Sequence, residues 1–431
     1  MLPIVLNTHR PVIKIKGIDV SDIIKQISIT ESIFEPVVRG SFVVFDTASS
    51  RLYQIVGDVT ALSPIEFSFH SMMNSSPEKE IKSKEFHIYK YAAGATSGIS
   101  NSFSSGHFGS RYIFINEARM VSKYFNDSIS NIVVNLCKEI GIKCDATPSM
   151  GKIKKILPYD SVFSHIINVS KQARSSKNPK DVDYIFYQDI DGNFNFKPLS
   201  SFKKKQVKWK YNVLVPTPDL TIEQAKYSVL KHSVDDFSPF ENALGGMYSC
   251  EVVSFDTTTG NYYSKTHVFN QDKYTKISKK PVIDVDNDPL FKDVSKSGVA
   301  VRRFNKQSFL CDCSEPPSGY DEVGLQDDWV GDRLAAMQSS NQIILNIVVP
   351  GNSEMKVGDI MEFRRPINDS IAKIDKVDLK HGDIFYSGKF LITDITHDIV
   401  MQVGATPDAI TASYTMRVKA MKDSIGDENA Q

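Results

Sequence analysis

The chain has 431 residues, of which 41% are hydrophobic and 10% aromatic, so it can bury the cores of about two to four compact units. Lys plus Arg and Asp plus Glu both number 51, and this zero net charge argues against a dedicated nucleic-acid binder, which carries a basic excess. Five cysteines, an odd number spread over a long chain, do not make a disulfide framework.

Segments that direct a chain to a membrane are not evident in the sequence. The longest apolar stretch, Ile343 to Pro350, is interrupted by Asn346 and is far shorter than the roughly 20 residues that a membrane-spanning helix needs. Residues 1–10 lack the charged and apolar regions of a signal peptide. We therefore expect the protein to stay in the cytoplasm where it is made.

Residues 1–117 carry the alternating pattern of β-strands. Ile65, Phe67 and Phe69 fall on one face of a strand, because side chains in a strand alternate with a period of two. The same reasoning predicts strands at 40–46, 86–89 and 111–115. Residues 92–109 are rich in Gly, Ser, Ala and Asn, and we expect them to form a mobile loop or a loop that only a partner orders. Short strands at this spacing favour a barrel or a sandwich.

The pattern changes to a helical one after residue 118. Asp127 or Ser128 can cap a helix that Gly141 ends. Its buried face is predicted to consist of Ile129, Ile132, Val133, Leu136 and Ile140. A second helix is predicted over 161–173, and a hairpin over 183–188 and 194–197 turns at Asp191-Gly192. Residues 118–212 are thus expected to form a small α/β unit.

The basic run Lys203 to Lys205 is interpreted as the solvated edge of a hairpin rather than as a phosphate site. Strand patterns then return after residue 213, with a hairpin predicted over 247–255 and 262–269. Residues 276–325 carry many Pro, Asp and Ser, which predicts an extended insertion that runs over the surface. A helix is predicted to follow at about 327–339.

The last part of the chain is again predicted to be β. Strands are expected over 342–349, 359–363, 389–396 and 412–420, and residues 423–431 are expected to be a frayed polar tail. Two β-rich modules in one chain raise the hypothesis of a diverged duplication, although no residue-level repeat is evident.

Motifs for nucleotide binding and hydrolysis are absent: the sequence has no G-x-S-x-G elbow, P-loop, G-x-G-x-x-G or H-E-x-x-H. Asp284 to Asp288 begins like an EF-hand loop, but Pro289 replaces the required glycine, so we interpret it as a polar loop. Asp189 to Asn193 has the same superficial look, and its role as a hairpin turn explains it. Cys311 and Cys313 are only two ligands, which do not make a metal site.

Two histidines, His87 and His397, fall in predicted strands. A side chain bonded to a neighbouring strand is the expected role for each, rather than acid/base or metal duty. We therefore predict that the protein is not an enzyme, and we assign no catalytic, metal-binding or cofactor-binding residue.

The C-terminal region carries the most specific pattern. Ile343 to Ser353 is an aliphatic strand ending in a polar turn, and Met355 to Phe363 follows with the pair Gly358-Asp359, which suits a tight reversal. Tyr386 to His397 and Tyr414 to Val418 complete the pattern. This order resembles the last barrel of the central hub proteins of contractile-tailed bacteriophage baseplates, a family related to the spike proteins of type VI secretion.

The earlier part of the chain agrees with this resemblance, which covers about residues 11–420. It implies a mainly β fold with an α/β insertion, in which each chain holds two antiparallel β-barrels like those of tail tubes. The implied units are a first barrel at 1–117, the α/β domain at 118–212, a second barrel at 213–275 and 340–422, an extended insertion ending in a helix at 276–339, and the polar tail at 423–431.

A hub protein of this kind forms a homotrimeric ring with pseudo-six-fold symmetry, and the ring adapts a hexameric tail tube to a trimeric central spike. The resemblance implies a virion protein of the tail baseplate, assembled in the host cytoplasm. Its partners would be the spike, tail-tube or tube-initiator proteins, baseplate wedge proteins and the tape measure protein. DNA would pass through the channel without specific binding, and basic clusters such as Lys203 to Lys205 would face outward.

Three other functions stay open at this point. The chain could be a type VI-like spike or another tail-tube component. A β-rich carbohydrate-binding module would remain monomeric and would expose an aromatic patch. An unrecognised hydrolase would need acid/base residues clustered around a pocket.

Overall fold

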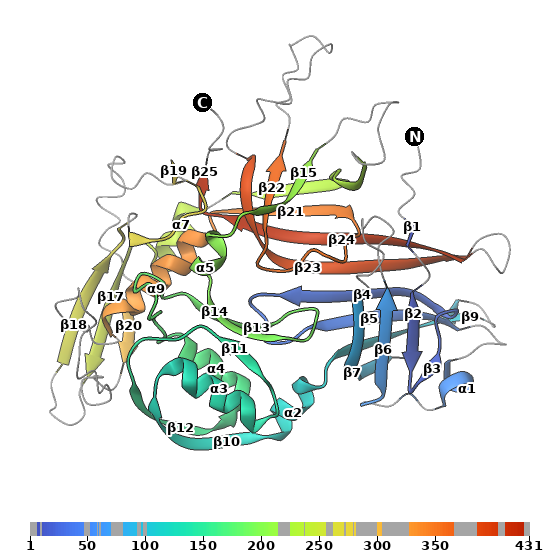
Figure 1. Cartoon of the computed structure of the whole chain (residues 1–431), viewed down its shortest axis with the longest axis horizontal. Coiled ribbons are helices and arrows are strands. Elements are labelled where there is room, and N and C mark those ends of the chain that lie inside the picture. The colour runs from blue at the N-terminus through green and yellow to red at the C-terminus, as the bar shows by residue number, and fades with distance from the viewer. Residues whose placement is uncertain are drawn as a thin grey trace, which may run out of the picture.

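The computed structural model in Figure 1 is mainly β, as the sequence predicts. It describes residues 7–8, 11–46, 52–57, 59, 62–69, 81–92, 96–97, 101–213, 225–236, 238–255, 262–270, 273–278, 280–281, 300–303, 327–365, 386–403 and 410–425. Fifteen strands belong to one large sheet, which extends from β16 at one end to β3 at the other.

Strands from the first part of the chain form one half of this sheet. They are β2 (Val12–Ile15), β3 (Ile18–Asp19), β4 (Ile24–Ser32), β5 (Arg39–Asp46), β6 (Pro64–Phe69), β7 (Ile81–Ala92), β8 (Thr96–Ser97) and β9 (Asn101–Ser110). A short helix, α1 (Leu52–Val56), follows β5 and precedes β6 along the chain. The alternation predicted for β6 is confirmed, because Ile65, Phe67 and Phe69 are all buried.

Strands from the last part of the chain form the other half. They are β15 (Val207–Asn212), β16 (Lys231–Asp235), β21 (Ile343–Pro350), β22 (Ile360–Arg364), β23 (Gly388–Val403) and β24 (Ile410–Lys422), and β1 (Asn7–Thr8) joins β24. The four C-terminal strands predicted from the sequence are therefore confirmed.

The two halves have the same strand order. In the first half, β4, β5, β9, β7 and β6 are neighbours in that sequence, and in the second half β16, β21, β24, β23 and β22 are neighbours in the same way. Every neighbouring pair is antiparallel in both halves. The strands also follow one another along the chain in the same order, β4, β5, β6, β7 and β9 in the first half and β16, β21, β22, β23 and β24 in the second. The outermost pairs differ, because β2 runs antiparallel to β6 whereas β15 runs parallel to β22.

The match extends to the pairing of single residues. In β7 the register with β9 shifts between Ile88 and Lys90, and in β23 the register with β24 shifts between Ile392 and Asp394. Ile88 exchanges backbone hydrogen bonds with Leu62 and Ser63, and Ile392 does so with Gly358 and Asp359. We refer to the two matching sets of five strands as the first and second repeats.

The turn before β6 and the turn before β22 also match in backbone conformation. Leu62 has a φ of 77° and Gly358 a φ of 80°, so both lie in the left-handed region that glycine adopts most easily. The positive φ expected for a tight reversal at Gly358-Asp359 is thus confirmed. A shared bulge and a shared turn support the hypothesis of a diverged duplication.

The repeats meet where β4 pairs with β23, in an antiparallel register that runs from Asp394 opposite Ser32 to Val400 opposite Gln26. In Figure 1 the red strands β23 and β24 lie above the blue strands β4 and β5. One hydrophobic core extends through both repeats, from Ile13 to Met421. The strands thus form one continuous sheet, and the arrangement as two closed barrels stays a prediction.

Residues 112–203 contain a compact α/β unit with a hydrophobic core of its own. Its elements are α2 (Tyr112–Ala118), β10 (Met120–Asp127), α3 (Ile129–Glu139), β11 (Cys144–Ala146), β12 (Ile153–Ser161), α4 (Val162–Ser170), β13 (Tyr184–Gln188), β14 (Phe194–Pro198) and α5 (Ser200–Lys203). Ser128 caps α3 by accepting a hydrogen bond from the Asn131 amide, and Gly141 follows it with a φ of +75°. Both predicted helices and the predicted hairpin are confirmed.

The remaining elements belong neither to the two repeats nor to the α/β unit. They are α7 (Pro239–Leu244), β17 (Ser249–Phe255), β18 (Tyr262–Val268), β19 (Lys280–Pro281), β20 (Ala300–Arg303), α9 (Asp327–Ser340) and β25 (Ser424–Ile425). Figure 1 shows β17, β18, β20 and α9 at the left and β19 and β25 near the top, close to the C-terminus. The hairpin predicted at 247–269 is confirmed, because β17 and β18 pair antiparallel. The helix predicted near 327–339 is α9.

Three predictions about local structure are wrong. Residues 111–115, predicted as a strand, belong largely to the helix α2, in which Tyr112 packs edge-on against Phe194 at 5.2 Å. The predicted mobile loop at 92–109 contains most of β9, which pairs with β5 from Ser102 to Gly109. Residues 423–425, predicted as part of a frayed tail, include the buried Asp423 and the strand β25.

Candidate functional site

The junction between the repeats contains a buried acidic residue. Ile27, Ile29 and Glu31 lie on the inward face of β4, because they alternate with half-buried neighbours. Glu31 is 0% exposed. A carboxylate at such a position is costly unless polar groups surround it, so its partners are informative.

Three segments supply those partners. One Glu31 carboxylate oxygen, Oε2, accepts a hydrogen bond of 2.9 Å from the backbone amide of Ile190, in the turn of the β13–β14 hairpin. The other, Oε1, lies 4.0 Å from Nε2 of His397 on β23. Nδ1 of His397 is hydrogen-bonded to the hydroxyl of Tyr414 on β24, at 2.6 Å. The network therefore joins the α/β unit to both repeats.

Burial dominates the electrostatics of this network. It raises the pKa of Glu31 above the ordinary value of 4.5, although the neighbouring His397 and the Ile190 amide act in the opposite direction. Burial also raises the pKa of the Tyr414 hydroxyl. The bond that the sequence predicts between His397 and a neighbouring strand is confirmed.

An acid, a histidine and a hydroxyl in series are also the components of a hydrolase triad. Here the hydroxyl at the end of the series belongs to a tyrosine. Glu31 and His397 are 0% exposed, and Tyr414 is 2% exposed. A substrate cannot contact side chains that are sealed in the core. The arrangement therefore fits a structural connection between strands.

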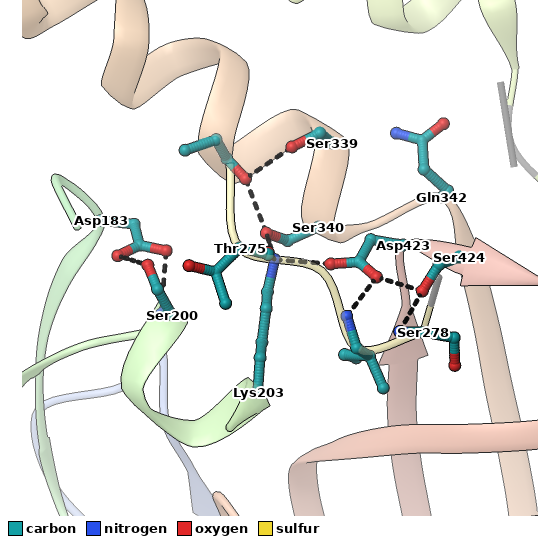
Figure 2. A network of polar contacts seen from close by, with 12 residues as sticks. Asp183, Ser200, Lys203, Thr275, Ser278, Ser339, Ser340, Gln342, Asp423 and Ser424 are labelled. Carbon is teal, nitrogen blue, oxygen red and sulfur yellow. Dashed lines mark hydrogen bonds and ion pairs between the residues drawn. The ribbon is translucent and has the colours of Figure 1, made fainter. Parts of the chain in front are cut away.

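A second buried network lies where α5, α9 and the end of β24 meet (Figure 2). Nζ of Lys203 donates to Asp423 Oδ2 at 2.8 Å, to Ser340 Oγ at 2.7 Å and to the carbonyl of Thr275 at 3.2 Å. Asp423 accepts a further bond from the Ile277 amide at 2.9 Å. The Lys203 side chain is 3% exposed and that of Asp423 is 5% exposed, so both charges depend on this network.

The interpretation of Lys203 to Lys205 as a solvated edge is wrong for Lys203. Its neighbours diverge from it: Lys204 is half exposed and lies 3.4 Å from Asp181, and Lys205 donates to the Gly358 carbonyl at 2.7 Å. Three ammonium groups with separate partners do not converge on one anion. This geometry is consistent with the interpretation that Lys203 to Lys205 do not form a phosphate site.

Other residues singled out in the sequence have local roles or fall outside the description. Asp189 accepts from the Asn193 amide at 2.8 Å across the hairpin turn, as the turn interpretation predicts. His87 lies in β7, with its ring edge-on to Phe114. Residues 284–288, 311 and 313 lie outside the described residues. Over the described part of the chain, no three His, Cys, Asp or Glu side chains cluster in a way that could hold a metal ion.

Sequence reasoning did not single out Glu31, Tyr414 or Asp423. Glu31 had a detectable signal, since a charged residue takes an inward position in the run Ile27, Ile29, Glu31. Asp423 had none, because its partners Lys203 and Ile277 are far away in the sequence.

An exposed apolar surface lies on the two-stranded sheet of β10 and β12. Tyr124 faces Ile156 across the strands, and these side chains and Tyr159 are all exposed. Apolar groups gathered on one sheet face are typical of surfaces that contact another protein.

None of the helices in the described residues is long and apolar enough to cross a membrane.

Comparison with known proteins identifies the fold. No family model matches the chain, and no curated protein matches its sequence. A 43 kDa tail protein of prophage MuSo2 from Shewanella oneidensis superposes with a TM-score of 0.52 at 10% identity, covering 96% of this chain and 98% of that one. A tail protein from Neisseria meningitidis MC58 superposes with a TM-score of 0.55 at 9% identity, covering 96% of each chain. The chain shares its fold with these two tail proteins over nearly their whole length.

Proposed function

We propose that the chain is a structural subunit of a phage-tail baseplate hub. One observation carries this proposal: the fold matches two tail proteins from end to end, with little left over on either side. The order of motifs from Ile343 to Val418, which resembles hub proteins, points the same way.

The proposed assembly is a homotrimer in which each chain supplies two tube-like units, so that three chains form a ring of six. The two repeats of matching strand order support this, because each repeat can occupy an equivalent place in the ring. Such a ring adapts the hexameric tail tube to the trimeric central spike. The proposed partners are the spike, tube or tube-initiator proteins, wedge proteins and the tape measure protein, in the baseplate of the virion.

The proposal is of a conduit and not of an enzyme. The one acid–histidine–hydroxyl series that we describe, Glu31, His397 and Tyr414, is sealed in the core. DNA would pass through the ring without specific contacts, and the balance of 51 basic and 51 acidic residues is compatible with weak phosphate binding.

Native mass spectrometry of the purified chain, alone and mixed with its cognate spike protein, tests the proposal. The expected result is a trimer, formed by the chain alone or in the presence of the spike. A stable monomer at micromolar concentration under both conditions would refute the hub function.

A further inference from the structure

Each repeat has a strand that can pair beyond its own repeat, but among the described residues only one of the two possible junctions is made. The first strand of the first repeat, β4, pairs with β23 of the second repeat. The first strand of the second repeat is β16, and among the described residues its one strand partner is β21. Lys231, His232, Ser233 and Asp235 of β16 are exposed.

The strand of the first repeat that corresponds to β23 is β7. Its pairing with β6 ends at His87, and its pairing with β9 continues to Ala92. At Lys90 and Ala92, no strand in the described part of the chain pairs with the other edge of β7. The corresponding stretch of β23 begins at Asp394, which is where β4 pairs with it.

The shared register defines which residues correspond. The common bulge aligns Lys90 with Asp394 and therefore Ala92 with Thr396. Across the next two strands, Ser41 is opposite His107, the partner of Lys90, and Asn346 is opposite Lys419, the partner of Asp394, so Gly40 corresponds to Leu345. Gly40 is opposite Ile29 and Leu345 is opposite Val234, so Ile29 corresponds to Val234. It follows that Thr30 corresponds to Asp235.

We propose that the exposed edge of β16 pairs antiparallel with the Lys90–Ala92 edge of β7 in a second copy of this chain, in the register of the internal β23–β4 junction. This inference rests on the proposed ring of identical subunits. It places Asp235 of one copy opposite Ala92 of the next. The internal and the intermolecular junctions then become equivalent, which allows a ring to close with every repeat in the same environment.

The chemistry of the two edges suits this pairing. In the internal junction the equivalent pair, Thr30 and Thr396, has its hydroxyl oxygens 3.0 Å apart. Asp236 takes the place of the buried acid Glu31 but is exposed in the single chain, where it accepts a hydrogen bond from Tyr386. An exposed edge strand promotes uncontrolled association unless a partner covers it, so a defined second copy also protects the protein.

Disulfide crosslinking tests the register directly. Opposed residues of an antiparallel pair have Cα atoms about 4.5–5.5 Å apart, within the range that a disulfide spans. The variant Ala92→Cys/Asp235→Cys, treated with diamide as a thiol oxidant, is expected to shift from a one-chain band to two-chain and three-chain bands on a non-reducing gel. Each single-cysteine variant is a control for crosslinking through the native cysteines, and it is expected to run as a one-chain band.

Two further variants make the result specific. Ala92→Cys/Ser233→Cys moves one cysteine two residues along β16, to a diagonal position about 7–8 Å away, and should crosslink weakly. Thr30→Cys/Thr396→Cys places the same pair in the internal junction, and should lose the two introduced thiols while remaining one chain. Both variants keep the exposed edges that the proposal needs.

The outcomes separate this inference from the proposed function. Covalent trimers from the matched pair alone support the register. If native mass spectrometry shows a trimer that the matched pair does not crosslink, or that the offset pair crosslinks better, the register is refuted and the hub proposal stands. A chain that is monomeric at micromolar concentration with and without its spike refutes both.

Discussion

At the scale of single residues, the buried carboxyl of Glu31 is the most unusual feature of the core. It is fully enclosed, and its two oxygens face the Ile190 amide and the His397 ring. Burial raises its pKa above 4.5, so the folded chain holds this proton at pH values where the unfolded chain releases it. Between these two pKa values the folded state binds more protons, and a rise in pH therefore favours unfolding.

This reasoning predicts the pH dependence of the variant Glu31→Gln. The amide keeps an acceptor for Ile190 and does not titrate, so it escapes the loss of stability that the carboxyl imposes above pH 4.5. The free energy of unfolding of the variant should rise relative to that of the wild type as the pH rises above 4.5, by at most about 1.4 kcal/mol per pH unit. Urea unfolding at several pH values measures it.

A matched control is Glu35→Gln, which removes a half-exposed carboxylate that lies 3.8 Å from Arg39. Its stability relative to the wild type should change much less with pH. If the wild type instead became more stable relative to Glu31→Gln as the pH rose, the polar contacts of the Glu31 carboxylate would outweigh the cost of its burial.

At the scale of elements, the repeated turn before β6 and β22 defines how each of these strands begins. Gly358 has a φ of 80°, and a Cβ added there would lie 3.0 Å from the ring of Phe202. Gly141, after α3, has a φ of 75°, with no atom within 4 Å of such a Cβ. The two glycines thus share a conformation and differ in crowding.

We therefore expect Gly358→Ala to lower the free energy of unfolding by about 1–3 kcal/mol, because a side chain is strained at positive φ and also presses on Phe202. Gly141→Ala should cost only the strain, about 1–2 kcal/mol. Chemical denaturation of both variants gives the difference. Equal losses would show that Phe202 moves aside freely, and no loss at Gly358 would contradict the turn geometry.

The elements also show how far the sequence could be interpreted. Periodicity was sufficient for the helix at Ser128, the hairpin at Asp191-Gly192 and the C-terminal strands, because local patterns determine them. It failed at β9, whose Gly and Ser residues have low strand propensity. Glycine is needed there for packing, since a Cβ at Gly106 would lie 2.2 Å from the ring of Phe42 on β5.

The failures at the sites have a different cause. The apolar run Tyr112 to Ile115 is too short for its period to separate strand from helix, and tertiary contacts such as Tyr112 with Phe194 decide it. Lys203 looked like part of a surface run because its partner Asp423 is 220 residues away. Pairings of that range cannot be derived from one sequence, whereas the candidate role of His397 in a strand could.

At the scale of the whole molecule, the Lys203–Asp423 network joins segments that no single repeat contains. Lys203 ends α5 of the α/β unit, Asp423 follows β24 of the second repeat, and Ser340 ends α9. Figure 2 shows the lysine extending from α5 toward this meeting point. The network is thus positioned to hold the C-terminal end of the sheet against the α/β unit.

Removing the lysine leaves the Asp423 carboxylate buried without its cation, which is more costly than the loss of a surface pair. Lys203→Met is therefore expected to lower the free energy of unfolding by about 3–5 kcal/mol. The matched control Lys204→Met removes a half-exposed lysine one residue away, whose ion pair with Asp181 contributes about 1 kcal/mol or less. Urea unfolding compares the two variants.

The double variant Lys203→Met/Asp423→Asn tests the physical reason. Asparagine has no charge to leave unpaired and still offers an oxygen to the Ile277 amide, so the double variant should be more stable than Lys203→Met alone. If Lys203→Met were no more harmful than Lys204→Met, the ion pair would not hold these segments together. If the double variant were the less stable of the two, hydrogen bonds made by Asp423, and not its unpaired charge, would account for the loss.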